Sequence, residues 1–171
     1  LLAAHNTVVS GFQVAVMAPT EILAKQHYNL AKKIFSKDIN TQLITGKSDY
    51  KTKKDILNKL TTKEIDIIFG THAIFQKKVS YKNLGLIIID EQHKFGVNQR
   101  KKLSDKGGNN CDVLLMTATP IPRTLTMTMY GDMDLSIIAE KPKLRKPIKT
   151  YSKLESKIDD IITFIKKEIK V

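Results

Sequence analysis

The amino-acid sequence predicts an α/β fold built on a doubly wound, mostly parallel sheet. The clearest sign is the stretch 86–89, where apolar residues, most of them β-branched, follow one another without alternation. That pattern is typical of a strand buried on both faces, as in a parallel sheet covered by helices. Segments of this kind alternate along the chain with segments of helical spacing, which is the order expected of a doubly wound sheet.

Predicted helices and strands follow one another through most of the chain. The first residues, up to His5, resemble the end of a helix, because no helix-start signal precedes them. Another helix is expected over residues 49–60, with Ile56 and Leu60 facing inward and the lysines outward. In the helix that opens with Pro19-Thr20-Glu21, the apolar residues at roughly helical spacing are Ile22, Leu23, Leu30 and Ile34. Strands are predicted at residues 12–18, 41–45, 65–69, 84–89, 112–116 and 135–139, and a further helix at about 121–130.

The composition changes at residues 141–147, where prolines and basic residues leave little to bury. This composition predicts a linker. We therefore expect one domain over residues 1–140 and the start of a second over residues 148–171. In that second part, residues 148–151 could begin a strand, and residues 154–169 have the single apolar stripe of an amphipathic helix.

The chain is basic, with 29 lysines and arginines against 17 aspartates and glutamates and a formal net charge of +12. This excess favours a polyanionic partner such as nucleic acid. A genome that favours lysine codons explains it equally well, because lysines far outnumber arginines. Cys111 is the single cysteine, which excludes an internal disulfide and a paired-cysteine metal site. No apolar run reaches membrane-spanning length, and we expect a cytoplasmic protein.

Two adjacent carboxylates, Asp90 and Glu91, directly follow the predicted strand at residues 84–89. Open α/β sheets bind ligands at the carboxyl ends of their strands. One carboxylate there could hold Mg²⁺ through water, while the other polarises a water that attacks a γ-phosphate. Taken alone, the pair is explained equally well by a polar turn that ends the strand.

Three more predicted strand ends carry hydroxyl-bearing or helix-starting turns, and with the carboxylate pair they resemble the motor core of superfamily 2 helicases. The resemblance is closest to the RecG family of DNA helicases. Segments similar to that family's motifs Ia, Ib, Walker B and III are residues 18–27, 70–76, 90–100 and 117–125, beginning Ala18-Pro19-Thr20-Glu21, Gly70-Thr71-His72, Asp90-Glu91-Gln92-His93 and Thr117-Ala118-Thr119-Pro120. Lys94 departs from the family pattern, which usually has arginine there. The transcription-repair coupling factor shares the last motif, but Gln92 and the tail at residues 130–135 favour RecG.

The resemblance implies a RecA-like motor domain of the P-loop NTPase fold that uses ATP and Mg²⁺. Asp90 would coordinate Mg²⁺ through water, and Glu91 would orient or deprotonate the attacking water. The residues that would relay hydrolysis to the DNA grip are Gln92, His93, Thr117 and Thr119. The residues that would lie along the DNA are Pro19, Thr20, Thr45, Gly46, Thr71, His72 and Arg123. Arg123 could equally pair with an acidic residue, Glu21 could be only a favourable charge in the first turn of its helix, and Gln26 and His27 are expected to serve packing and surface.

No GxxxxGK[ST] sequence occurs in the 171 residues. Gly46-Lys47-Ser48 spells the end of such a P-loop, but the glycine required five residues earlier is Thr41. By the resemblance, the chain begins inside the helix that follows the P-loop. The missing strand would leave a gap or an open edge beside the strand that ends in Thr117-Ala118-Thr119, and so a disrupted sheet or self-association.

The function expected from the resemblance is that of an ATP-dependent helicase that remodels branched DNA, such as replication forks and Holliday junctions, in recombination and repair. Its partner would be branched or double-stranded DNA. We expect the 171 residues by themselves to be inactive. The alternatives are a duplex DNA translocase similar to the coupling factor, and a nucleic-acid-binding module without motor activity.

Overall fold

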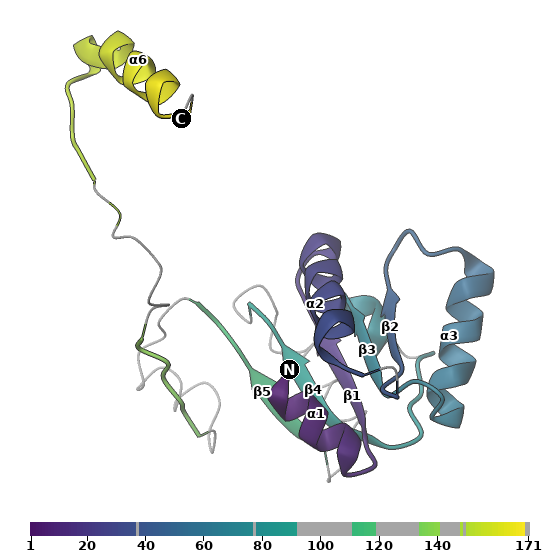
Figure 1. Cartoon of the computed structure of the whole chain (residues 1–171). Coiled ribbons are helices and arrows are strands. Elements are labelled where there is room, and N and C mark those ends of the chain that lie inside the picture. The colour runs from purple at the N-terminus through teal and green to yellow at the C-terminus, as the bar shows by residue number, and fades with distance from the viewer. Residues whose placement is uncertain are drawn as a thin grey trace. The chain divides into compact units, whose positions relative to one another are not determined.

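The computed structural model describes residues 1–36, 38–76, 78–91, 111–118, 134–140, 148 and 150–169. The chain divides into two compact units, Leu1–Ile121 and Pro122–Val171. Figure 1 shows the first unit as a sheet with helices packed on it. Among the described helices, none combines the length and the apolar character needed to cross a membrane.

A five-stranded parallel sheet forms the centre of the first unit, which confirms the predicted α/β class. The strand order is β2-β3-β1-β4-β5, and every neighbouring pair is parallel. The strands are β1 (Gln13–Met17), β2 (Thr41–Ile44), β3 (Ile67–Gly70), β4 (Leu84–Ile89) and β5 (Asp112–Leu115). Because β1 lies between β3 and β4, the order reverses at β1, which is where doubly wound sheets bind ligands.

Helices cover both faces of this sheet. Alternate residues of each strand point to opposite faces. Val14 and Val16 pack with Ala4 of α1 (Leu2–Val9) and Ala31 of α2 (Glu21–Ile34). On the other face, a second apolar cluster includes α3 (Tyr50–Thr62) and the 3₁₀ helix η1 (His72–Phe75). Ile56 and Leu60 of α3 are buried, as predicted.

Three of the four apolar residues named from the sequence for the helix at Pro19 are exposed, and Leu23 is half-buried. Ile22, Leu30 and Ile34 are 72%, 48% and 58% exposed. Ala24 and Ala31 are the buried residues of α2 instead. Small side chains let the helix approach the sheet, and half-buried Tyr28 also packs on this side, with its ring centre 6.0 Å from that of Phe69 in β3.

Two predicted strands are absent from the described part of the second unit. Residues 134–140 and 150–154 have no regular structure, so the strand predicted at 135–139 and the strand start at 148–151 are wrong for the residues described. An isolated extended segment has no neighbour to complete its hydrogen bonds, so apolar, β-branched composition alone does not make a strand. The helix predicted at 154–169 is present as α6 (Ile158–Ile169), preceded by the 3₁₀ helix η4 (Glu155–Lys157). The helix expected at about 121–130 lies outside the described residues.

The sheet is continuous across the described strands, and β5 lies at one edge of it. The disrupted sheet that was expected from a missing strand is therefore not seen among the described strands. The side chains of β5 alternate between exposed and half-buried. Self-association through this edge stays a prediction.

Candidate functional site

The predicted motif residues follow strands that end on the same level of the sheet. Met17 is paired with Gly70 and with Ile89, Ile44 with Gly70, and Ile89 with Leu115. The ladder continues one residue further, because Asp90 N donates to Met17 O at 2.9 Å and Ala18 N donates to Gly70 O at 3.0 Å. The turns after all five strands therefore lie along one carboxyl edge.

Asp90 is held at this edge by hydrogen bonds to both carboxylate oxygens. Its Oδ1 accepts a hydrogen bond from Glu91 N at 3.0 Å, and its Oδ2 lies 2.8 Å from His27 Nε2 on α2. The two side chains are partly buried, with exposed fractions of 29% for His27 and 21% for Asp90. His27, which was expected to serve packing and surface, therefore contacts the predicted Mg²⁺ carboxylate. The sequence carries no local signal of this contact, since 63 positions separate the residues.

Glu91 has left-handed backbone geometry, with φ of 52°. A residue other than glycine in that region costs about 1–2 kcal/mol. Such strain is concentrated at functional sites, where the surrounding structure holds it in place. In this chain the strained residue is Glu91, which was predicted to orient or deprotonate the attacking water.

The turn after β1 is organised by the start of α2. Thr20 is the N-cap of α2, and its Oγ1 accepts a hydrogen bond from Leu23 N at 3.3 Å. Glu21 does more than add charge to the first turn, because its Oε1 accepts a hydrogen bond from Gly46 N at 2.7 Å. These contacts join two of the predicted DNA-contacting segments.

The turn after β2 is held by its own side chains and by α3. Ser48 Oγ accepts a hydrogen bond from Thr45 N at 3.1 Å, and Lys53 Nζ donates to Gly46 O at 2.9 Å. Asp49 is the N-cap of α3, where its side chain accepts a hydrogen bond from Thr52 N at 3.2 Å. The turn is therefore a defined structure, although it is not a P-loop.

The turns after β3 and β5 complete the described edge. A Cβ atom added to Gly70 would lie 2.6 Å from Ile74 Cγ2 and 2.7 Å from Ile44 O, so only glycine fits between the strand and η1. Thr71 is the N-cap position of η1, which begins at His72. Thr117 is exposed after β5. The predicted site residues Gln92, His93, Thr119 and Arg123 lie outside the described residues.

The donor set suits a magnesium ion that is shared with phosphate and water. Within the described ranges, no group of three or more His, Cys, Asp and Glu side chains could hold a metal. Mg²⁺ does not require such a group, because proteins commonly bind it through one or two carboxylates together with substrate phosphates and waters. Asp90 and Glu91 carry hard carboxylate oxygens of that kind.

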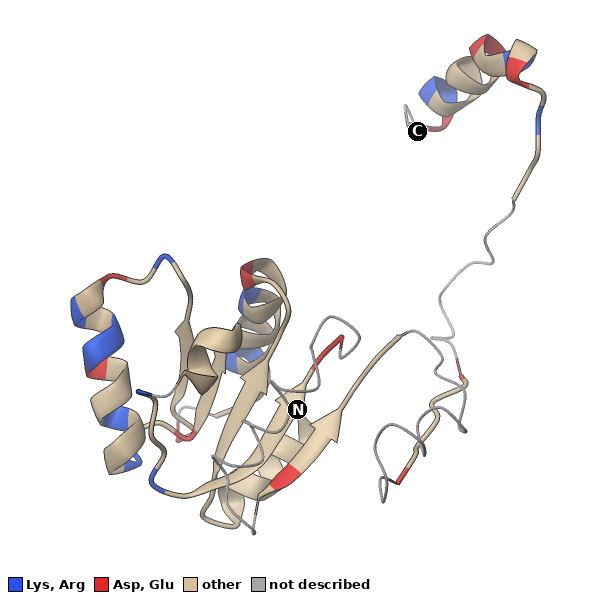
Figure 2. Ribbon diagram, turned by 180° about the vertical axis from the view of Figure 1, so that it is seen from behind, with Lys and Arg blue, Asp and Glu red and all other residues tan. Residues whose placement is uncertain are grey.

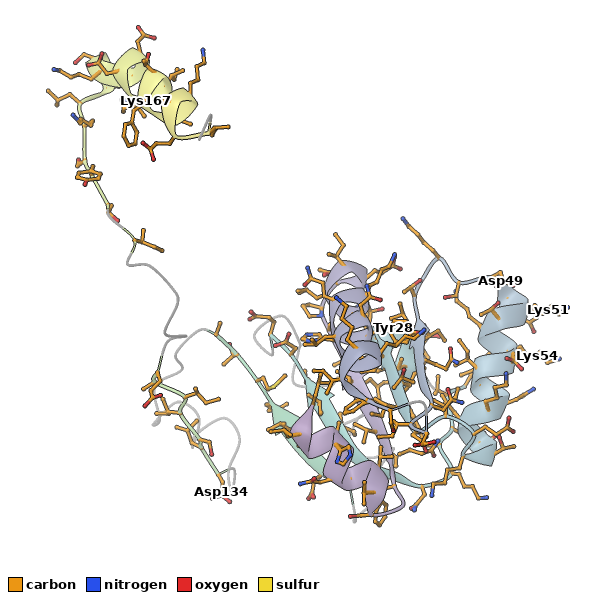
Figure 3. All side chains as sticks on the ribbon, in the orientation of Figure 1. Tyr28, Asp49, Lys51, Lys54, Asp134 and Lys167 are labelled. Carbon is orange, nitrogen blue, oxygen red and sulfur yellow. The ribbon has the colours of Figure 1, made fainter. Side chains whose placement is uncertain are left out.

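Positive charge gathers on α3 and its flanking turns (Figure 2). Figure 3 shows Lys51 and Lys54 pointing away from the body of the first unit. Lys59 pairs with Asp55 at 2.7 Å, and this hydrogen bond raises the pKa of Lys59. The lysines of this region are Lys47, Lys51, Lys53, Lys54, Lys59 and Lys63.

Known proteins share both the sequence and the fold. The family model of the DEAD/DEAH box helicases matches residues 1–128. The ATP-dependent DNA helicase RecG of Bacillus subtilis is 49% identical over 170 residues, which cover 99% of this chain and 25% of that relative. RecG of Streptococcus pneumoniae is 48% identical over 168 residues, which cover 98% of this chain and 25% of that relative.

A solved structure of RecG bound to a three-way DNA junction matches with a TM-score of 0.82 and 37% identity, over 99% of this chain and 22% of that one. The chain thus spans about a quarter of the length of the curated relatives described above. The family match covers most of the chain, and these relatives agree on one kind of helicase. The chain therefore belongs to the DEAD/DEAH box helicase family, and in sequence and fold it is similar to the RecG helicases named above.

Proposed function

We propose that these residues form part of an ATP-dependent helicase that remodels branched DNA, and that they supply its hydrolytic carboxylates. The observation that carries this proposal is the position of Asp90 and Glu91, which follow a central strand at the carboxyl edge of a parallel sheet. The described turns with predicted DNA-binding residues, after β1, β2 and β3, lie on the same edge. The RecG relatives favour this function over that of a coupling-factor translocase.

Bound ATP and Mg²⁺ would supply the phosphoryl group and its charge neutralisation. Asp90 would hold the metal through water, and Glu91 would orient the attacking water. The residues proposed to relay hydrolysis to the DNA grip are Gln92, His93, Thr117 and Thr119. The 171 residues contain no GxxxxGK[ST] sequence, so we expect turnover from the full-length protein and not from these residues alone.

Branched DNA is the substrate that the solved relative suggests, because that protein is bound to a three-way DNA junction. The contacts would come from the turns at the carboxyl edge, through Pro19, Thr20, Thr45, Gly46, Thr71 and His72, and through Arg123. Phosphate contacts position a nucleic acid without reading its sequence. We therefore expect binding that depends on DNA structure and falls steeply as salt rises.

The test is the ATPase rate of the full-length protein with forked DNA, measured for the wild type and for Glu91→Gln. Loss of a general base lowers turnover about 100- to 10,000-fold, and we expect a loss in that range with nucleotide and DNA binding retained. Glu64→Gln is the matched control, since Glu64 is an exposed glutamate two residues beyond the end of α3. Unchanged turnover in Glu91→Gln would show that the assigned role is wrong.

A further inference from the structure

We infer that His27 is a positioning residue that fixes the orientation of the Asp90 carboxylate. The inference rests on the proposed function of Asp90 as the metal-holding carboxylate. His27 lies on α2 and Asp90 follows β4, and the contact between Nε2 and Oδ2 is 2.8 Å long. This is the distance of a charge-assisted hydrogen bond.

The contact completes the restraint of the Asp90 side chain. The backbone of Asp90 is held in the sheet ladder by its hydrogen bond to Met17 O. Its Oδ1 accepts a hydrogen bond from the N–H of Glu91, the next residue. Its Oδ2 is held by His27, which lies on a different element, α2. Two bonds from different directions oppose rotation about both side-chain torsions, so the carboxylate presents its remaining lone pairs in one direction.

The chemistry of the pair places the hydrogen on the imidazole. An ionised carboxylate has only acceptor positions, so a contact of 2.8 Å requires Nε2 of His27 to carry the hydrogen. The side chain therefore acts here as a donor to Asp90. Partners of this type that orient a metal-binding side chain commonly affect metal affinity strongly.

Helix α2 is well suited to hold such a donor in place. Its first turn is capped by Thr20 and tied to Gly46 through Glu21, and its buried side is packed through Ala24 and Ala31. His27 lies less than two helical turns after Glu21, roughly 9 Å along the axis. The same rigid helix therefore contacts the turn after β2 and the carboxylate after β4.

The test uses full-length protein and a fluorescent ATP analogue whose binding is titrated with Mg²⁺. His27→Leu removes the donor, whereas His27→Gln keeps an N–H donor at similar reach. We expect His27→Leu to raise the Mg²⁺ concentration for half-maximal binding roughly 10-fold, and His27→Gln to restore most of the loss. In His27→Leu, the fold decrease in kcat should exceed the fold increase in KM for ATP. The temperature of thermal unfolding and the affinity for DNA should stay close to those of the wild type.

His5→Leu is the matched control, because His5 is an exposed helical histidine whose ring stacks on Phe35. It should leave the Mg²⁺ midpoint unchanged. If His27→Leu does not fold, His27→Asn takes its place, since the shorter amide cannot span the contact. The inference would be overturned if His27→Gln raised the Mg²⁺ midpoint as much as His27→Leu or its substitute does. An unchanged midpoint in His27→Leu or its substitute would also overturn it.

Asp90→Asn separates this inference from the proposed function in the same titration. We expect it to weaken the Mg²⁺ dependence more than any substitution of His27. If Asp90→Asn leaves that dependence intact, the proposed role of Asp90 fails. If Asp90→Asn abolishes it while His27→Leu has no effect, the positioning role of His27 alone fails.

Discussion

The carboxylate of Glu21 accepts a hydrogen bond from the backbone N–H of Gly46 at 2.7 Å and so ties the first turn of α2 to the turn after β2. The same glycine is held from its other side, because Lys53 Nζ donates to Gly46 O at 2.9 Å. Gly46 is thus restrained by two side chains of opposite charge. This restraint places a predicted DNA-contacting turn next to the start of α2.

Glu21→Ala should release the Gly46 amide. Because the amide lies in an exposed turn, its exchange with solvent hydrogen depends on local opening, and loss of the acceptor makes opening easier. We expect clearly faster exchange at Gly46 in Glu21→Ala, measured by NMR, and an intermediate rate in Glu21→Gln, which keeps an acceptor oxygen. Glu64→Ala is the control. Equal protection of Gly46 in Glu21→Ala and the wild type would contradict the restraint.

Gln13→Met should destabilise the fold strongly. Gln13 is 0% exposed, and its amide group serves four backbone groups, donating to Leu60 O and Ile65 O and accepting from the N–H groups of Lys82 and Asn83. Methionine has similar volume but removes this partner from the carbonyl groups of buried Leu60 and Ile65 and from the N–H groups of exposed Lys82 and Asn83, at a cost on the order of 2–4 kcal/mol. Urea unfolding measures the change in free energy of unfolding.

The control for Gln13 is Gln42→Met in β2, a half-buried glutamine whose side-chain N–H donates to Asn40 Oδ1 at 3.5 Å. This change should stay within about 0.5 kcal/mol. Similar decreases in the free energy of unfolding in the two variants would mean that the hydrogen bonds of the Gln13 amide do not stabilise the fold more than those of Gln42.

Asp49 should stabilise α3 in a pH-dependent way. Hydrogen bonds from the side chain and the backbone N–H of Thr52 lower the pKa of Asp49 below its ordinary value of 3.8. A lowered pKa in the folded state gives stability that is present above 3.8 and is lost as the pH falls through the folded value. Asp49→Asn keeps a capping side chain without the titration, whereas Asp49→Ala removes the cap.

We therefore expect the wild type to lose stability relative to Asp49→Asn as the pH falls from neutral to below 3.8. Asp49→Ala should be less stable than both the wild type and Asp49→Asn at neutral pH. Thermal unfolding followed by circular dichroism gives both comparisons. A constant difference between wild type and Asp49→Asn across this range would refute the pH-dependent role.

Cys111 should react slowly in the folded chain. Burial, and secondarily the negative charge of Asp112, raises the pKa of Cys111 from 9.0 to about 11. The thiolate is the nucleophile, and a rise of this size lowers its population at neutral pH about 100-fold. Alkylation by iodoacetamide, followed by mass spectrometry, should therefore be far slower in the folded chain than in urea.

The same shift makes the folded state less stable as pH rises from 9.0 towards 11, because only the unfolded chain then gives up the thiol proton. The chain has one cysteine, so the alkylation signal is unambiguous. Equal alkylation rates in buffer and in urea would show that the thiol is not shielded.

The local sequence was sufficient to predict a helix or strand where the pattern of apolar residues within one segment indicated how that segment is buried. The strand predicted at residues 84–89 is β4, because an unbroken run of apolar residues requires burial on both faces. The inward positions of α3 were also predicted, since Ile56 and Leu60 are one helical turn apart. At residues 135–139 the same kind of composition gave a wrong strand, because a strand also needs a neighbour and the described residues offer none.

The amino-acid sequence by itself determined the α/β class, the family resemblance and the position of Asp90 and Glu91 after a buried strand. Only the tertiary structure decided that Ala24 and Ala31 are buried in α2, whereas Ile22, Leu30 and Ile34 are exposed. It also decided that His27 contacts Asp90 and that Glu21 contacts Gly46. The physical reason is that these contacts join side chains far apart along the chain, and their distances depend on how closely helix and sheet pack.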